Sequence, residues 1–122
     1  MLVVGPPGSG KSDLVLRLLD RGFTLVADDQ VEVEDGRARP PARLAGLLEV
    51  RGLGILRLPY LEEVQLSLTV SAGVAERLPE PRTHLGVPLI VLDPLQASAP
   101  ARVARALDCA QGGTMIAGAF VP

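Results

Sequence analysis

One stretch decides the fold class: Gly5-Pro6-Pro7-Gly8-Ser9-Gly10-Lys11-Ser12, which fits the pattern G-x-x-x-x-G-K-[ST] at every position. Its glycines allow the backbone to wrap closely around an anion, and the N–H groups at the start of the next helix face that anion. In such a P-loop the Lys11 ammonium contacts the β- and γ-phosphates, and the Ser12 hydroxyl is a Mg²⁺ ligand. Residues 5–12 therefore predict a site for ATP and Mg²⁺.

Both flanks of this loop fit the interpretation. Residues 2–4 are apolar and predict the end of a buried strand. Residues 11–21 predict a helix, because leucines at 14, 18 and 19 recur at helical spacing, and Gly22 is placed to end it. A strand, a glycine-rich loop and an amphipathic helix in this order predict an α/β domain.

The rest of the chain is richer in strand signals than in helix signals. Alternating and apolar runs predict strands, and Asp35-Gly36 predicts a hairpin turn. Hairpins within an α/β protein imply a mixed sheet in place of an all-parallel one. The expected elements are strands at 24–27, 30–34, 64–70 and 87–92, a loop with a short helical turn at 37–48, a surface loop at 76–82, a helix from Ser98 or Ala99 to about Ala110, and an edge strand or loose tail at 114–121.

Composition narrows the class of protein. A length of 122 residues suits one domain over residues 1–122, and 48% hydrophobic with 21% charged residues suits a globular one. Two Phe, one Tyr, no Trp and a net charge of −2 argue against nucleic-acid binding. A single cysteine, Cys109, forms no internal disulfide and fits a cytoplasmic location. We expect no membrane span and no secretory signal, since no apolar run approaches ~20 residues and no charged n-region with a cleavage site is present.

Two further segments carry charged groups suited to phosphoryl transfer. Asp28-Asp29 follows the expected strand at 24–27, where a carboxylate can hold Mg²⁺ or take a proton from an attacking hydroxyl. The alternative is a turn that ends the strand with two solvated carboxylates; the P-loop favours the functional interpretation. Glu49 and Arg51 would point to the same side of an extended chain. Together they could bind a metal ion and a phosphate, or they could form a surface ion pair. Spacing alone does not choose between these two.

Three segments together resemble the catalytic domain of the HPr kinase/phosphorylase family: GPPGSGKSDLVLRLLDRG, then LVADDQVEV, then LLEVRGLGILRL. They follow in the family's order between residues 2 and 58, and the last contains Glu49–Ile55, which is close to the family's signature. The chain resembles the short form found in alpha-proteobacteria. The resemblance implies a fold similar to the nucleotide domain of phosphoenolpyruvate carboxykinase. It also implies a kinase for a serine of HPr, the small phosphocarrier of the sugar phosphotransferase system, and self-association, as in the hexamers of long members.

The resemblance implies a role for each matching residue. Residues 5–12 would bind the nucleotide, and Asp29 would be the general base on the substrate serine, with Asp28 in support. Glu49 would be a further metal ligand, and Arg51 would shape the catalytic loop. The residues expected in the site are therefore Lys11, Asp29, Asp28 and Arg51 for catalysis, Gly5, Pro6, Pro7, Gly8, Ser9, Gly10, Lys11 and Ser12 for the nucleotide, and Ser12 and Glu49 for the metal.

The chain also departs from the family pattern. The family's catalytic histidine precedes the P-loop and has no counterpart in residues 1–4, while His84 is expected at the surface. The family's Pro-Gly-Arg segment has no match near residues 92–94. These departures predict weak or absent phosphorylase activity. Alternatives to the serine kinase are a small-molecule kinase of the same fold, a nucleotide-sensing regulator, and a P-loop ATPase whose hydrolysis drives an unknown process.

Overall fold

The computed structural model describes residues 1–120. The chain divides into two compact units. One comprises Met1–Lys11 with Leu66–Pro122, and we call it the sheet unit. The other is the continuous segment Ser12–Gln65, and we call it the hairpin unit. That residues 1–122 act as a single domain stays a prediction.

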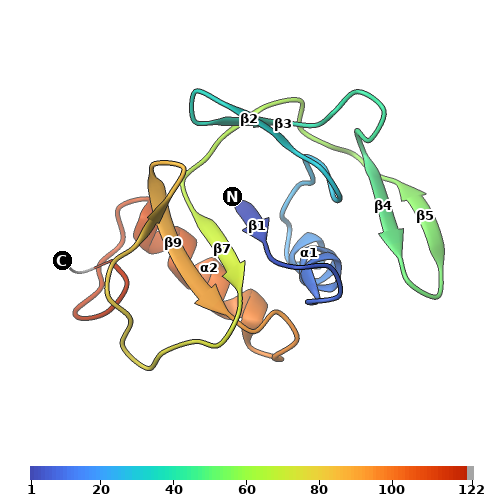
Figure 1. The fold of residues 1–122 in the computed structure, drawn as a ribbon. Coiled ribbons are helices and arrows are strands. Elements are labelled where there is room, and N and C mark those ends of the chain that lie inside the picture. The colour runs from blue at the N-terminus through green and yellow to red at the C-terminus, as the bar shows by residue number, and fades with distance from the viewer. Residues whose placement is uncertain (121–122) are drawn as a thin grey trace. The chain divides into compact units, whose positions relative to one another are not determined.

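The sheet unit is built on one mixed four-stranded sheet. Its strands are β1 (Leu2–Val4), β7 (Thr69–Ala72), β9 (Val87–Leu92) and β8 (Thr83–His84), in the order β1-β7-β9-β8. The first three run parallel (Figure 1), and β8 is antiparallel to β9. Because β1 and β7 are far apart in the sequence, this sheet depends on long-range pairing. The predicted α/β class with a mixed sheet is confirmed.

Helix α2 (Ala99–Ala110) completes the sheet unit, as the sequence predicts. Pro100 lies in its first turn, where the missing N–H is not needed. Val103 is fully buried and Ala106 nearly so, and the helix contacts β9. The same unit buries Leu68 and Val70 completely. Within residues 1–120, no helix is long and apolar enough to cross a membrane.

The hairpin unit contains almost all of helix α1 (Lys11–Asp20), from its second residue onward. Leu14 and Leu18 are buried, which agrees with the predicted apolar stripe. The helix ends in paired hydrogen bonds, from the Gly22 N–H to the Leu19 carbonyl and from the Phe23 N–H to the Leu18 carbonyl. This is the Schellman pattern, with Gly22 after the last turn as predicted.

Two small antiparallel sheets make up the rest of the hairpin unit. One joins β2 (Glu32–Glu34), β3 (Arg37–Arg39) and β6 (Val64–Gln65), and its β2–β3 turn at Asp35-Gly36 is the predicted hairpin. The other is a hairpin of β4 (Leu47–Val50) and β5 (Gly54–Arg57). In Figure 1 the β4–β5 pair is a separate two-stranded ribbon.

The strand predicted at 64–70 is wrong as a single element. The chain forms β6, leaves the ladder at residues 66–68, and then forms β7 in a different sheet. Leu66 and Leu68 are nevertheless buried, as the alternation requires. Period-two alternation reports which side chains are buried, and it does not report which strands pair.

Other predicted elements differ in smaller ways. Residues 24–27 form no strand, and Leu25 makes only an isolated bridge to Tyr60, where the neighbouring Pro59 has no N–H to extend a ladder. Strands β3, β4, β5 and β8 were not predicted, and the loop with a helical turn expected at residues 37–48 contains β3 and the start of β4. Residues 114–120 form no strand, and Val121 lies outside the described residues.

Candidate functional site

The glycine-rich loop, residues 5–10, connects β1 to α1. Its backbone turns at Pro6, whose carbonyl accepts a hydrogen bond from the Ser9 N–H at 3.3 Å. The Lys11 ammonium donates to the carbonyl oxygen of Gly5. The N–H groups in the first turn of α1 have no partner within the helix. The loop therefore combines a lysine folded along it with helix donors that remain available to an anion.

A cleft of about 520 Å³ opens beside this loop within the sheet unit. Pro6 and Ser9 line it together with residues that follow β7 and β9, among them Asp93 and Arg102. The Ser9 hydroxyl is buried and has no hydrogen-bond partner among residues 1–120. Ligands of α/β proteins commonly bind at the carboxyl ends of parallel strands. The cleft lies at that position and contains both a carboxylate and a guanidinium.

Ser12 and Asp28 are brought together within the hairpin unit. The Ser12 hydroxyl, in the first turn of α1, donates a hydrogen bond of 2.9 Å to the Asp28 carboxylate. Hydroxyl and carboxylate oxygens are the hard ligands that Mg²⁺ prefers, and Mg²⁺ usually takes its other ligands from waters and phosphates. This pair therefore fits the predicted ion. Residues 1–120 contain no cluster of three His, Cys, Asp or Glu side chains, so no all-protein metal cage is formed.

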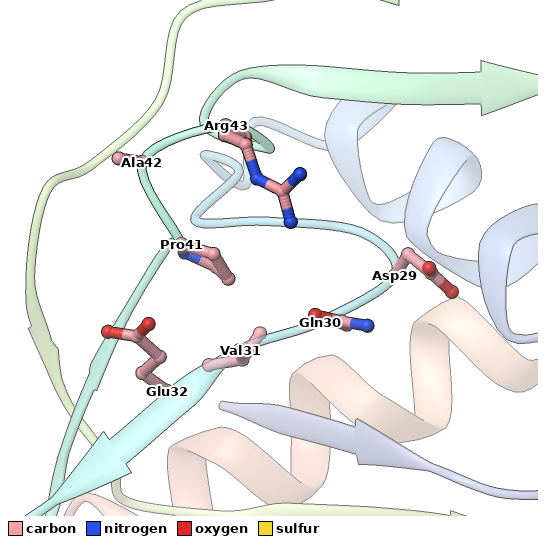
Figure 2. A pocket seen from close by; sticks show the side chains of 7 residues that line it. All are labelled: Asp29, Gln30, Val31, Glu32, Pro41, Ala42 and Arg43. Carbon is pink, nitrogen blue, oxygen red and sulfur yellow. The ribbon is translucent and has the colours of Figure 1, made fainter.

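Asp29 is exposed and lines a second cleft, of about 680 Å³, within the hairpin unit. Figure 2 shows this cleft between the segment that carries Asp29 and the segment that carries Arg43. The two neighbouring aspartates thus differ in environment, because Asp28 is half-buried and accepts the Ser12 bond whereas Asp29 faces solvent. Of the pair, Asp29 is the more exposed carboxylate, and it has no hydrogen-bond partner within residues 1–120.

Glu49 and Arg51 lie in and after β4. Glu49 is exposed on the strand, but the strand ends at Val50 and Arg51 begins the turn to β5. The expectation that both point to the same side assumed an extended chain through residue 51, and that assumption is wrong. A hydrogen bond of 2.9 Å from the Leu53 N–H to the Val50 carbonyl closes the turn. His84 is exposed, as expected, although it lies in β8.

The strongest charge cluster lies on β3 and beside β6. Glu63 accepts hydrogen bonds from the Arg39 Nε at 2.8 Å and from an Arg37 guanidinium nitrogen at 3.2 Å. The hydrogen bond to Arg39 lowers the pKa of the Glu63 carboxyl below its usual value, and the same bond raises the pKa of Arg39. All three side chains are exposed, so solvent screens this cluster.

Some residues of the two clefts were missed by sequence reasoning. Arg43 follows a Pro-Pro pair, and Asp93 and Arg102 lie after β9 and on α2. None of them belongs to a pattern with fixed spacing. The carboxyl end of the predicted strand 87–92 is the one signal that could have indicated Asp93.

The architecture and the glycine-rich loop define the class: an α/β protein with a mixed sheet and an amphipathic helix directly after a G-x-x-x-x-G-K-S segment. The particular family follows from comparison. The family model described as HPr Serine kinase C-terminal domain matches residues 1–62, which is half of the chain. The chain belongs to this family, and the resemblance of its three segments is confirmed.

Individual relatives agree with the family assignment. An HPr kinase/phosphorylase of Clostridium novyi is 48% identical over 65 residues, and one of Xylella fastidiosa is 48% identical over 68 residues. Each match covers 50% of this chain and 21% of the relative, so the chain accounts for about a fifth of those proteins. The structure of the Hpr(Ser) kinase/phosphatase from Coxiella burnetii superposes with a TM-score of 0.70, over 91% of this chain and 89% of that one. At 24% identity this likeness shows the fold.

Proposed function

We propose that this protein is an ATP- and Mg²⁺-dependent serine kinase whose acceptor is an HPr-like phosphocarrier protein. The family and the names of the relatives support the reaction class. The observation that carries the proposal is the 2.9 Å hydrogen bond from Ser12 to Asp28. This bond joins Ser12, the last residue of the G-x-x-x-x-G-K-S segment, to Asp28 of the aspartate pair. The proposed reaction needs both of these motifs.

The glycine-rich loop is the proposed P-loop. The Lys11 ammonium already donates to an oxygen at the first residue of this loop, Gly5, and a phosphate oxygen would replace that carbonyl as its acceptor. The loop N–H groups and the start of α1 would offset the charge that develops on the transferred phosphoryl group. Residues 5–12 would thus bind and orient the nucleotide.

Ser12 is the proposed metal ligand, with Asp28 beside it. When bound, Mg²⁺ would neutralise charge on the β- and γ-phosphates. Asp28 fixes the Ser12 hydroxyl through their hydrogen bond, so it would orient that ligand. Glu49 is exposed on β4 and is the proposed further ligand, and Arg51 in the adjoining turn would shape the catalytic loop. Both of these roles rest on the family resemblance.

Asp29 is the proposed general base. It is exposed at the edge of a cleft, where an acceptor hydroxyl can approach it. It would accept the proton of the serine hydroxyl as the serine oxygen attacks the γ-phosphorus and ADP leaves. We further propose that residues 1–122 form one catalytic domain in the cytoplasm and that it resembles the nucleotide domain of phosphoenolpyruvate carboxykinase. Self-association stays a prediction from the family.

The test is transfer of label from γ-labelled ATP with Mg²⁺ to the HPr-like carrier of the same organism. A carrier with its acceptor Ser→Ala is the substrate control. We expect Asp29→Asn to lower the transfer rate by about a hundredfold or more, the usual size for a lost general base. Nucleotide binding should be retained, because Asp29 is not part of the loop.

Two matched variants make this test specific. Asp35→Asn changes the same side chain in the β2–β3 turn, where Asn tolerates the positive φ of 52°, and should leave transfer intact. Lys11→Ala should remove most turnover, whereas Lys11→Arg separates loss of charge from loss of shape. Normal transfer by Asp29→Asn would remove Asp29 as the base. Nucleotide binding without any transfer by the wild-type protein would favour a nucleotide sensor.

A further inference from the structure

The cleft that Asp29 lines also contains Arg43, which belongs to none of the sequence motifs. We call it the Arg43 cleft. It lies wholly within the hairpin unit and has a volume of about 680 Å³, inside the usual range for binding pockets. In Figure 2 the Arg43 side chain extends from its loop toward the segment that carries Gln30 and Val31. Its full lining is Asp29, Gln30, Val31, Glu32, Pro41, Ala42 and Arg43.

The Arg43 cleft contains two carboxylates, Asp29 and Glu32, and one guanidinium, Arg43. Glu32 stands opposite Arg39 in the β2–β3 register, so a cation accompanies it. Arg39 in turn binds Glu63. Arg43, by contrast, is exposed and makes no ion pair or side-chain hydrogen bond within residues 1–120. The cleft therefore offers a guanidinium, on Arg43, and an exposed carboxylate, on Asp29, and neither is engaged in an ion pair within residues 1–120.

The lining also favours a particular kind of ligand. Val31, Pro41 and Ala42 supply apolar surface, while Gln30 supplies an amide that can pair with a peptide backbone. An unpaired guanidinium binds carboxylates in a planar, two-point geometry. A short peptide segment with an acidic side chain satisfies all of these groups together, and its main chain can pair with Gln30.

The inference that follows rests on the proposed function, since it takes Asp29 as the general base. A base must come within hydrogen-bond reach of the acceptor hydroxyl. The residues on either side of that serine must then lie along a surface next to Asp29, and the Arg43 cleft, which Asp29 lines, is such a surface. We propose that the Arg43 cleft binds the acceptor segment of the carrier protein, and that Arg43 determines specificity by pairing with a carboxylate a few residues from the serine.

The experiment uses serine peptides of one length and sequence, with Asp, Asn or Lys placed in turn at the three positions on each side of the serine. Binding is measured by fluorescence anisotropy, and phosphorylation by transfer of label. At one position the wild-type protein should favour Asp over Asn by about tenfold or more in binding and in kcat/KM, the size of a charged hydrogen bond. Arg43→Ala should abolish this preference and leave the KM for ATP unchanged.

Matched variants complete the design. Arg57→Ala removes another exposed arginine of the hairpin unit that lies outside the cleft, and the preference should persist. Arg43→Glu should reverse the preference toward Lys at the same position, which a merely structural arginine would not do. Competition by inorganic phosphate gives a further arm: if Arg43→Ala weakens that competition and leaves the Asp preference, the cleft is a phosphate subsite and the inference is wrong.

The two proposals fail in different ways. If the wild-type protein labels the carrier and Arg43→Ala has the same peptide preference, the Arg43 inference is overturned and the kinase proposal stands. If peptides bind with an Arg43-dependent preference but neither carrier nor peptide is labelled, the docking role holds and the kinase proposal is overturned. If there is neither binding nor labelling, both are wrong.

Discussion

The two glycine-rich regions of the protein differ in how closely their backbone is packed, and Gly5 and Gly52 show the contrast. A Cβ atom on Gly5 would lie 2.7 Å from the Cβ of Ala72 on β7 and 3.0 Å from the Ser9 hydroxyl. A Cβ on Gly52, in the β4–β5 turn, would meet nothing within 4 Å. Both residues have a positive φ, of +156° at Gly5 and +83° at Gly52, which side-chain-bearing residues rarely adopt.

The difference separates a packed loop from an open turn. At Gly5 the backbone of the loop lies directly against a strand of the sheet unit, so the loop is held in shape by close contact. At Gly52 only the backbone conformation favours glycine, because a side chain there would meet no neighbouring atoms. A preorganised loop suits the binding of phosphates, whose partners must already be in position. An open turn suits a segment that another molecule approaches, and Arg51 lies in it.

The largest effect that would test this contrast is expected from Gly5→Ala. The clash with Ala72 involves a Cβ fixed to a strand, so backbone must move. We expect a loss of about 1–3 kcal/mol in the free energy of unfolding, as for other overpacked sites. Nucleotide affinity should fall as well, because the loop would be displaced. Urea unfolding and nucleotide titration measure the two effects.

The double variant Gly5→Ala with Ala72→Gly provides the control. It removes the atom that the new methyl group would strike, so it should recover part of the lost stability relative to the sum of the single changes. Strict additivity of the two single variants would show that the contact between the loop and β7 is not what requires glycine at residue 5.

A smaller loss is expected from Gly52→Ala. There the cost is left-handed backbone alone, about 1–2 kcal/mol for a residue with a Cβ. Gly52→Asn should lose less, because Asn adopts this conformation more readily. Thermal unfolding of the two variants gives the comparison. Equal losses for Ala and Asn would indicate that a side chain of any kind is excluded, and the turn would then not be open.

Sequence reasoning was most accurate where a local pattern determines structure. The end of α1 at Gly22, the turn at Asp35-Gly36, strand 87–92 and helix α2 follow from short-range rules, and the structure has all of them. The error at residues 64–70 is different in kind. Alternation there identified the buried side chains, but the change from one sheet to another depends on pairing with strands distant in the sequence.

The same limit applies to the candidate site. The G-x-x-x-x-G-K-S segment and the aspartate pair are contiguous motifs, and the sequence reveals them. The sequence does not show that Asp28 and Asp29 differ in environment. Asp28 accepts the hydrogen bond of Ser12, which lies 16 residues earlier in the chain, and this contact exists only in the folded protein. Arg43 is harder still, since a lone arginine after two prolines is typical of a surface loop. Only the cleft of the folded hairpin unit indicates a use for it.

A weaker effect is expected for the charges that join β3 to Glu63. The pKa of the Glu63 carboxyl is lowered in the folded state, chiefly by the hydrogen bond from Arg39, so folding favours the ionised carboxylate. The stabilisation is therefore present at neutral pH, above the unfolded pKa, and is lost as the pH falls through the folded pKa. Wild type should be slightly more stable than Glu63→Gln at pH 7, and the difference should shrink as the pH falls below the ordinary pKa of glutamate and through the lowered folded-state pKa. A difference that grew on acidification would contradict this assignment.

The smallest effect is expected at the tip of the β4–β5 hairpin. Leu53 and Ile55 are each 71% exposed, so their side chains bury little apolar surface on folding. Ile55→Thr keeps the β-branched shape that suits a strand and should change the free energy of unfolding by no more than about 0.5 kcal/mol. Thermal unfolding at several protein concentrations is the measurement. A loss of stability well above that value, growing with protein concentration, would mean that Ile55 is covered in an assembly. The free space found over Gly52 would then be present only in the isolated chain.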